Sequence, residues 1–257
     1  MKVSVVTTCY NSASTIRDTI ESILSQTGPF ELEYIITDAG SKDTTRSIIA
    51  EYGDRIRLID ATGTNQSQGI NLGLRQARGE IVTFLNADDT YEPGAIARVV
   101  SAFASDPSKL WLAGRCRIID GAGRELHSAI TSYKNSLLRH YSYWLLLINN
   151  FICQPAVFMR REVFERYGYF SEQENYVMDY EFWLRVGADS PPILVDEYLA
   201  AFRRIEGTKS NTAYPRQFRD DARVAIQAAR RLGYSWTIPF KCVANALIVL
   251  IYSFLYR

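Results

Sequence analysis

The sequence predicts an α/β protein whose central sheet is mostly parallel and carries helices on both faces. Two observations support this fold class. Over residues 1–120, short runs of apolar and β-branched residues alternate with segments whose apolar residues recur at helical spacing. The strand-like runs are almost continuously apolar, which is typical of parallel strands buried on both faces.

The first half of the chain gives a regular series of elements. Residues 3–8 (VSVVTT) form the first expected strand, and Ser14 is expected to cap a helix with Ile16, Ile20 and Ile23 on one face. The pair Gly28-Pro29 ends that helix. Further strands are expected at residues 34–37, 56–59, 81–85 and 110–119, and further helices at residues 43–52, 68–77 and 93–103.

The second half is less regular in its pattern. Helices are expected at residues 135–148, 161–167, 179–186 and 220–232, and strands at residues 156–159 and 198–203. The aromatic residues Trp111 and Trp183 are expected to pack in the core. The sequence shows no internal repeat and no low-complexity segment.

Length and composition exclude several classes of protein. A chain of 257 residues with 47% hydrophobic residues can bury a core, and a net charge of +1 speaks against a nucleic-acid binder. The four cysteines are scattered without a CxxC pair, so the pattern favours free thiols in a reducing cytoplasm over a zinc site. The two histidines, His127 and His140, lie outside any motif, and surface positions are expected for both.

The two ends of the chain indicate where it acts. The N-terminus carries no signal-like segment, so a cytoplasmic location is expected. Residues 238–256 are apolar apart from Lys241. A spanning helix needs ~20 apolar residues, and the stretch is marginal because Pro239 and Lys241 shorten its clean part to residues 242–256. Three interpretations stay open: a helix on or in a membrane, a helix that docks a partner, and a core helix. Trp236, Tyr252 and Tyr256 suit the headgroup level of a membrane.

Polar residues follow three of the expected strands directly. They occupy residues 8–11, 38–41 and 86–89. In parallel sheets, ligands bind beyond the carboxyl ends of the strands. These three segments are therefore expected to line one binding site.

The strongest motif is the pair of carboxylates in FLNADD, Asp88 and Asp89, which follows a hydrophobic strand. A hard cation such as Mg²⁺ or Mn²⁺ prefers carboxylate and phosphate oxygens, so the pair is a candidate cation site. The alternative is a solvated acidic turn ahead of the helix that starts near Pro93.

Two further segments carry candidate site residues. Asp38 ends a buried strand and can accept a hydrogen bond from a base or ribose, while Gly40 allows close backbone approach. Asp179 stands at the start of an expected helix, where it is either a cap or a general base.

Taken together and in this order, these segments resemble family 2 of the inverting glycosyltransferases, which have the GT-A nucleotide-diphospho-sugar transferase fold. The opening VSVVTTCYNSASTIRDTIESILSQT is similar to that family's first strand and helix, GSKDTT to its "GSTDGT" turn, and GEIVTFLNADD to its metal motif. Met178-Asp179 stands where the family has Glu-Asp. The resemblance covers roughly residues 1–210. It implies a nucleotide-sugar-binding half (1–120), an acceptor-side half (121–210) and a helical C-terminal segment (211–257).

The resemblance implies a donor site on the first strands. Thr7, Cys9 and Tyr10 would flank the nucleobase, Asp38 would accept from the base N–H, and Asp88 would contact the ribose and phosphate side of the donor. A UDP-sugar is the favoured donor.

The resemblance also implies the chemistry of transfer. Asp89 would ligate Mg²⁺ or Mn²⁺, and Asp179 would deprotonate the acceptor hydroxyl. The anomeric carbon would undergo a single in-line displacement with inversion and without a covalent intermediate. The acceptor would be a saccharide or lipid-linked saccharide, as in bacterial surface-polysaccharide or glycolipid assembly, with residues 238–257 contacting the inner face of the cell membrane.

The chain departs from the family pattern at several positions. Asn86 replaces a frequent Asp, and Ile205 stands where relatives often have His. Gln66 and Gln68 fall where many members carry a charged residue, and both can hydrogen-bond the sugar or phosphate. Gln154 is a weaker candidate for substrate contact, with a core turn as its alternative role.

Two other functions stay open from the sequence. A nucleotidyltransferase of the same fold would need a Gly-rich, basic phosphate loop after the first strand, and residues 7–11 (TTCYN) do not supply one. A non-catalytic module that binds a nucleotide or a membrane partner is the second, and the substitutions at Asn86, Gln68 and Ile205 motivate it.

Overall fold

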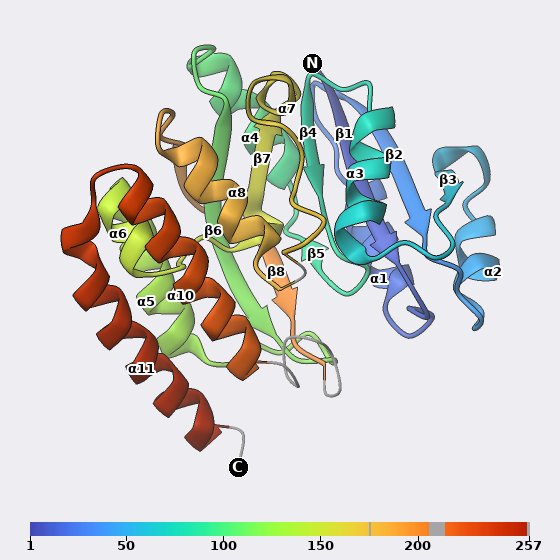
Figure 1. The fold of residues 1–257 in the computed structure, drawn as a ribbon. Coiled ribbons are helices and arrows are strands. Elements are labelled where there is room, and N and C mark those ends of the chain that lie inside the picture. Colours follow the sequence, from blue (N-terminus) through green and yellow to red (C-terminus); the bar gives the residue numbers. More distant parts are fainter. Residues whose placement is uncertain (175, 206–213, 256–257) are drawn as a thin grey trace.

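The computed structural model describes residues 1–174, 176–205 and 214–255. One mixed sheet of eight strands forms its centre, in the order β3-β2-β1-β4-β7-β6-β8-β5 (Figure 1). The strands are β1 (Lys2–Cys9), β2 (Glu31–Asp38), β3 (Arg57–Asp60), β4 (Ile81–Phe84), β5 (Thr90–Tyr91), β6 (Trp111–Ile119), β7 (Val157–Arg160) and β8 (Ile193–Arg203).

The first half of the sheet is parallel, as predicted. Strands β1, β2, β3 and β4 pair in parallel because a helix crosses over between each successive pair of strands. The crossover helices are α1 (Ile16–Leu24), α2 (Thr45–Ala50) and α3 (Gln66–Gln76). Gly69 brings α3 against β1, since a Cβ at that position would lie 2.6 Å from Thr8 Oγ1.

The second half of the sheet mixes directions. Strand β7 runs antiparallel to both β4 and β6, β8 runs parallel to β6, and the two-residue strand β5 pairs antiparallel with β8. Strand β8 begins at Ile193, five residues before the expected start at Tyr198. Its first part alternates exposed and half-buried residues, so it lacks the continuous apolar run of a buried strand.

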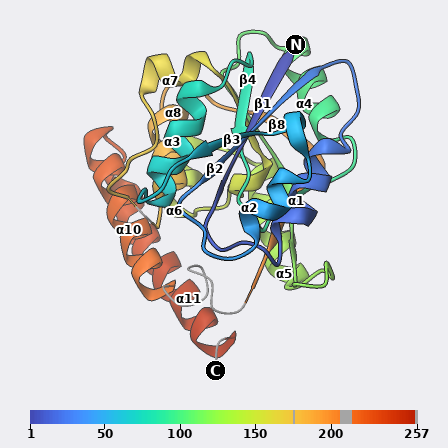
Figure 2. The ribbon, with the colours of Figure 1, turned by 90° about the vertical axis from the view of Figure 1, so that its right-hand side faces the viewer.

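Helices cover both faces of the sheet, as Figures 1 and 2 show. One core cluster packs α1 and α4 (Ala95–Ser105) against one face. The other cluster packs α3, α7 (Glu162–Tyr167), α8 (Met178–Gly187) and α10 (Tyr214–Arg231) against the opposite face. Trp111 and Trp183 stack in this second core with ring centroids 5.5 Å apart, which confirms their expected core positions.

Two helical expectations need correction. Residues 135–148 do not form one helix: α5 (Ser128–Arg139) ends at His140, and α6 (Tyr143–Ile148) begins after Ser142 in extended conformation. The chain turns there so that α6 can pack against α8 and α10. Ser14 is not the cap of α1, which begins after Thr15 without a side-chain cap hydrogen bond.

The helices α10 and α11 (Ile238–Leu255) form an antiparallel pair beside α6 (Figure 1). A salt bridge from Lys241 on α11 to Asp221 on α10 is almost fully buried between them. The segment Ser235–Ser253 is long and apolar enough to cross a membrane by length and composition, with 11% of it buried in the protein. Tyr256 lies outside the described residues.

Candidate active site

A cavity of about 940 Å³ lies at the carboxyl ends of β1 and β4, where the sequence places its polar segments. Its first wall comes from the loops that follow β1 and β4 and from the start of α3. Its second wall comes from α5, the start of α8, and the inner faces of α10 and α11. The cavity therefore joins the parallel half of the sheet to the C-terminal helices.

The end of β1 contributes Thr8, Cys9 and Tyr10 to the cavity wall, and Tyr10 is exposed. Thr7 is fully buried on the other face of the sheet, where its Oγ1 accepts a hydrogen bond of 3.1 Å from Tyr34. Neighbouring residues of a strand point to opposite faces, so Thr8 rather than Thr7 faces the cavity.

Asp38 is fully buried and lies behind the cavity wall that its neighbour Ala39 helps to form. Its carboxylate accepts hydrogen bonds from the Ser41 N–H and hydroxyl, from Arg46 Nε and from the Cys9 thiol. Although burial raises the pKa of Asp38, these bonds from Ser41 and Arg46 lower it below its usual value. The charged carboxylate thus fixes the turn after β2.

Gly40 sits within this turn at φ +95°, in the left-handed region that favours glycine. A Cβ there would also lie 3.1 Å from Thr62 Cγ2. Its role in the structure is to shape the turn whose Ala39 faces the cavity.

The two adjacent carboxylates have different positions. Asp88 is half-buried and lines the cavity, and burial raises its pKa. Asp89 is fully buried behind the wall, where it accepts hydrogen bonds from the Arg203 N–H (2.9 Å) and from Asn86 Nδ2 (3.1 Å). Burial and the charge of Asp88 raise the pKa of Asp89 well above its usual value. The geometry therefore offers Asp88, rather than Asp89, to a ligand.

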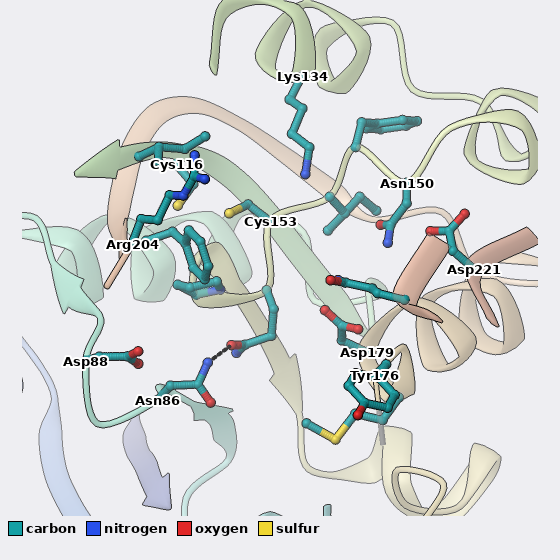
Figure 3. A pocket seen from close by; sticks show the side chains of 18 of the residues that line it. Asn86, Asp88, Cys116, Lys134, Asn150, Cys153, Tyr176, Asp179, Arg204 and Asp221 are labelled. Carbon is teal, nitrogen blue, oxygen red and sulfur yellow. Dashed lines mark hydrogen bonds between the residues drawn. The ribbon is translucent and has the colours of Figure 1, made fainter. Parts of the chain in front are cut away.

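Asn86 is the centre of an amide network at the cavity floor. Its Oδ1 accepts from Gln66 Nε2 at 2.9 Å, and its Nδ2 donates to Asp89 and to Gln154 Oε1 (3.4 Å; Figure 3). Gln154 Nε2 in turn donates to the Phe84 carbonyl at 2.6 Å. Both Gln66 and Gln154 line the cavity, and Gln154 also lies in the buried turn Gln154–Ala156, as its alternative role in a core turn predicted.

Gln68 has a different role from the one considered for it. It forms a capping box with Asn65, in which Asn65 Oδ1 accepts from the Gln68 N–H and Gln68 Oε1 accepts from the Asn65 N–H, both at 3.0 Å. This reciprocal pair starts α3 and leaves Gln66, the first residue of the helix, facing the cavity.

Asp179 lies at the start of α8 and projects into the cavity from a wall different from that of Asp88 (Figure 3). Its Oδ1 accepts from the Tyr180 N–H at 2.8 Å. Burial raises the pKa of Asp179, and the nearby Asp221 carboxylate raises it further. A half-buried carboxylate with a raised pKa is a suitable proton acceptor for a ligand hydroxyl.

The second wall contains polar and charged cavity-lining residues that the sequence analysis missed. They come from α5, the segment after α6, the residue after β8, α10 and α11, which carry no recognisable motif, and include Lys134, Asn150, Arg204, Asp221 and Lys241. His127, which was expected at the surface, is half-buried in this wall and accepts a hydrogen bond from Arg204. Burial and the Arg204 guanidinium lower the pKa of His127.

The donor set fits a hard divalent cation only with help from a ligand. Within the described ranges, no group of three or more His, Cys, Asp and Glu side chains is placed to hold a metal ion. The Asp88 carboxylate faces the cavity beside the amide oxygens of the Asn86 network. Mg²⁺ commonly binds through one or two carboxylates together with substrate phosphates, so one carboxylate suffices when a diphosphate completes the shell.

Curated relatives cover only part of this chain. An uncharacterized glycosyltransferase of Nostoc sp. (strain PCC 7120 / SAG 25.82 / UTEX 2576) is 32% identical over 173 residues, which make up 65% of this chain and 53% of that protein. The poly-beta-1,6-N-acetyl-D-glucosamine synthase of Staphylococcus epidermidis is 27% identical over 172 residues, 55% of this chain and 42% of that protein. The chain thus spans about half the length of these relatives.

Solved structures share the fold. TarS 1-349 of S. aureus in complex with UDP-GlcNAc aligns with a TM-score of 0.67 and 21% identity over 89% of this chain and 66% of that chain. The mannosyltransferase PcManGT from Pyrobaculum calidifontis in complex with GDP-Man and Mn²⁺ aligns with a TM-score of 0.65 and 18% identity over 98% of this chain and 79% of that chain. The fold is therefore the GT-A fold. The family described as Glycosyl transferase family 2 matches residues 4–168, and the chain belongs to that family.

Proposed function

We propose that the protein is a metal-dependent, inverting glycosyltransferase that moves one sugar from a nucleoside diphosphate sugar to an acceptor hydroxyl. One observation carries this proposal: Asp88 and Asp179 reach the same cavity of about 940 Å³ from different walls. In this proposal, the Asp88 carboxylate binds a cation that in turn binds the diphosphate, and the Asp179 carboxylate accepts a proton. Membership of glycosyl transferase family 2 supports the reaction class.

The donor lies along the first wall in this proposal. Thr8, Cys9 and Tyr10 flank the nucleobase, while the buried Asp38 and Gly40 hold the turn that completes its pocket. A UDP-sugar is the favoured donor, and the fold similarity to a UDP-GlcNAc complex supports that choice. Gln66 and the Asn86 network supply neutral hydrogen-bond partners to the sugar or phosphates.

Asp88 is the proposed ligand of Mg²⁺ or Mn²⁺, in place of Asp89. Asp89 is fully buried and its carboxylate is already hydrogen-bonded to Arg203 and Asn86. When bound, the ion neutralises charge on the diphosphate leaving group. Asp89 contributes indirectly, because its backbone and side-chain bonds hold the loop that presents Asp88.

Asp179 is the proposed general base. Inverting transfer needs a carboxylate on the side of the anomeric carbon opposite the leaving group, within about 3 Å of the acceptor oxygen. The start of α8 holds Asp179 on the second wall, opposite the donor residues. The acceptor hydroxyl binds between Asp179 and the donor sugar, loses its proton to Asp179, and attacks the anomeric carbon in one step.

The cytoplasmic face of the cell membrane is the proposed location, and assembly of a surface polysaccharide or glycolipid the proposed pathway. The exposed face of α11 is apolar, with Phe240, Val243, Leu247, Leu250 and Ile251 each more than half exposed. Lys241, the charged residue of α11, faces the other way and is paired with Asp221. A helix with one exposed apolar face and its charged residue on the opposite face can lie on a membrane surface with the apolar face in the lipid.

The start of α11 adds aromatic and basic residues to this surface. Trp236 contacts both Trp144 (6.0 Å between ring centroids) and Phe240 (6.3 Å), and all three side chains are exposed. Arg230 and Arg231, at the end of α10, are exposed close by in the chain. Aromatic rings at the headgroup level beside cationic side chains favour an anionic bilayer surface.

Purified protein tests the enzymatic proposal directly. Hydrolysis and transfer of UDP-sugars are measured with and without Mn²⁺ for the wild type, Asp88→Ala and Asp179→Asn. We expect metal-dependent turnover in the wild type and its loss in both variants. Turnover at near wild-type rates in both variants would contradict the assigned roles. Formation of a nucleotide sugar from a nucleoside triphosphate would instead indicate a nucleotidyltransferase, and nucleotide binding without turnover a non-catalytic module.

A further inference from the structure

Lys134 is a cationic side chain in the second wall that the proposed reaction does not use. It projects from α5 into the cavity, toward the region between Cys153 and Asn150 (Figure 3). Within the part of the chain that the structure describes, its ammonium group makes no hydrogen bond or ion pair. Its three N–H donors therefore have no acceptor among the described residues and are open to a ligand with anionic oxygens.

The other cations of the cavity are already engaged. Lys241 pairs with Asp221, and Arg204 donates to His127. Burial lowers the pKa of Lys134, but the neighbouring Cys153, Tyr252, Cys116 and Asp179 outweigh that effect and raise it above its usual value. Lys134 therefore carries its positive charge at neutral pH.

The surroundings of Lys134 are mostly apolar. On α5, Ile130 and Leu138 lie one turn to either side of it, and both line the cavity. Across the cavity, α11 presents Ala244, Ile248 and Tyr252, which are spaced by four residues and share one face. A ligand that fits here combines one anionic group with an apolar portion.

The location of Lys134 favours the acceptor over the donor. Among the groups that raise its pKa, which are Cys153, Tyr252, Cys116 and Asp179, the last-named carboxylate and Tyr252 belong to the second wall, from which Lys134 itself projects. Asp88, on the donor side, has Arg203 as its neighbouring cation. The ammonium group thus lies on the side of the general base, between α5 and α11.

We propose that Lys134 is a specificity residue that binds a phosphate group of an amphiphilic acceptor, whose apolar part lies between α5 and α11. This inference rests on the proposed function, because it names the acceptor class of the same site. The inner face of α11 contacts the apolar part of the acceptor, while its outer face contacts the bilayer from which that acceptor comes.

Equilibrium binding of matched amphiphiles tests this inference. Dodecyl phosphate, dodecyl β-D-glucoside and inorganic phosphate are titrated into the full chain by calorimetry, with and without UDP and Mn²⁺. We expect the wild type to bind dodecyl phosphate at least tenfold more tightly than either of the other probes. Lys134→Gln is expected to remove the preference over the glucoside, and Lys134→Arg to retain most of it.

A control variant lies on the same helix. Arg139 is exposed and paired with Asp196 at 2.9 Å, so Arg139→Gln removes the same charge outside the cavity and is expected to leave the preference unchanged. Because amphiphiles also bind the outer face of α11, the ratio of the two affinities is the measured quantity. Melting temperatures establish that each variant is folded.

Three results would overturn the inference. The first is a wild type without preference for dodecyl phosphate, and the second is a Lys134→Gln variant that keeps it. The third is a Lys134→Gln variant whose affinity for UDP falls while its amphiphile preference stays, which would assign Lys134 to the donor. UDP binding by the wild type is measured separately. Absence of UDP binding would count against the proposed function, whereas UDP binding without a preference for dodecyl phosphate would count against the acceptor assignment alone.

Discussion

Asn86 Nδ2 lies 3.1 Å from Asp89 Oδ2, and the same amide group donates to Gln154 Oε1 at 3.4 Å. This position is where the family pattern frequently has Asp. An amide is better suited here, because both neighbours are acceptors and Asp89 is fully buried. Asn86 therefore supports the loop that carries Asp88.

Asn86→Asp is expected to destabilise the protein, and more at high pH than at low pH. The new carboxylate would face Asp89 and Gln154 Oε1, and the loss of two donated bonds is expected to lower the free energy of unfolding by about 1–3 kcal/mol. In the folded variant, repulsion between the new carboxyl group and Asp89 raises the pKa of the pair. The variant is therefore more stable at low pH, where the pair is protonated, and loses stability as pH rises through that pKa.

Thermal unfolding at pH 5 and pH 8 measures this difference. Asn65→Asp, at an N-cap that accepts either residue, is the control; equal losses at both pH values would contradict the prediction.

Asp88 and Asp89 are expected to respond differently to substitution. Asp89→Ala leaves the Arg203 N–H without its buried acceptor, so the free energy of unfolding should fall by about 1–3 kcal/mol. Asp88→Ala should keep the melting temperature near that of the wild type and remove the response of turnover to Mn²⁺. Paired unfolding and activity measurements on the two variants check this, and the reverse outcome would return the cation site to Asp89.

The pH dependence of transfer should report Asp179. Burial and the Asp221 carboxylate raise its pKa, and the proposed base acts only when it is deprotonated. The value of kcat/KM should therefore rise with pH, with a midpoint above the usual carboxylate value of about 3.9. Asp221→Asn removes one cause of the shift and should move the midpoint to lower pH. A pH profile that is identical in the wild type and in Asp221→Asn would speak against Asp179 as the base.

Substitutions of Lys241 and Asp221, which form the buried salt bridge between α10 and α11, should have strongly non-additive effects on the free energy of unfolding. Lys241→Met leaves Asp221 charged and unpaired in a nearly closed interface, with an expected loss of about 3–5 kcal/mol in the free energy of unfolding. The double variant Lys241→Met/Asp221→Leu should recover most of this loss, because no uncompensated charge remains. Urea unfolding of the single and double variants measures the coupling. Additive losses would indicate that the pair is not buried.

The outer face of α11 should bind anionic membranes. Leu247→Glu/Leu250→Glu places two charges on this exposed face and should weaken binding to phosphatidylglycerol vesicles at least tenfold, with little effect on the melting temperature. Leu58→Glu/Leu194→Glu, at exposed residues of β3 and β8, is the matched control and should bind as the wild type does. Cosedimentation measures both, and equal binding by all three proteins would rule out this surface.

The sequence determined most of the fold and the location of the site. The apolar runs of β1, β2 and β4 and the polar residues that follow them predicted the parallel half-sheet and its ligand-binding edge. These features are local, since a strand with two buried faces and a polar exit can be recognised without knowledge of its neighbours. Asp179 and Gln66 were predicted as site residues, and both line the cavity.

Only the tertiary structure decided which neighbouring side chains reach the cavity. Thr8 rather than Thr7 faces it, because neighbouring residues of a strand point to opposite faces. Asp88 rather than Asp89 faces it, because the loop after β4 turns Asp89 inward to the Arg203 N–H and Asn86. The second wall likewise depends on how α5, α10 and α11 pack, and no local pattern brings Lys134 and Tyr252 to the same cavity. Those contacts join residues more than 100 positions apart, so long-range packing alone sets them.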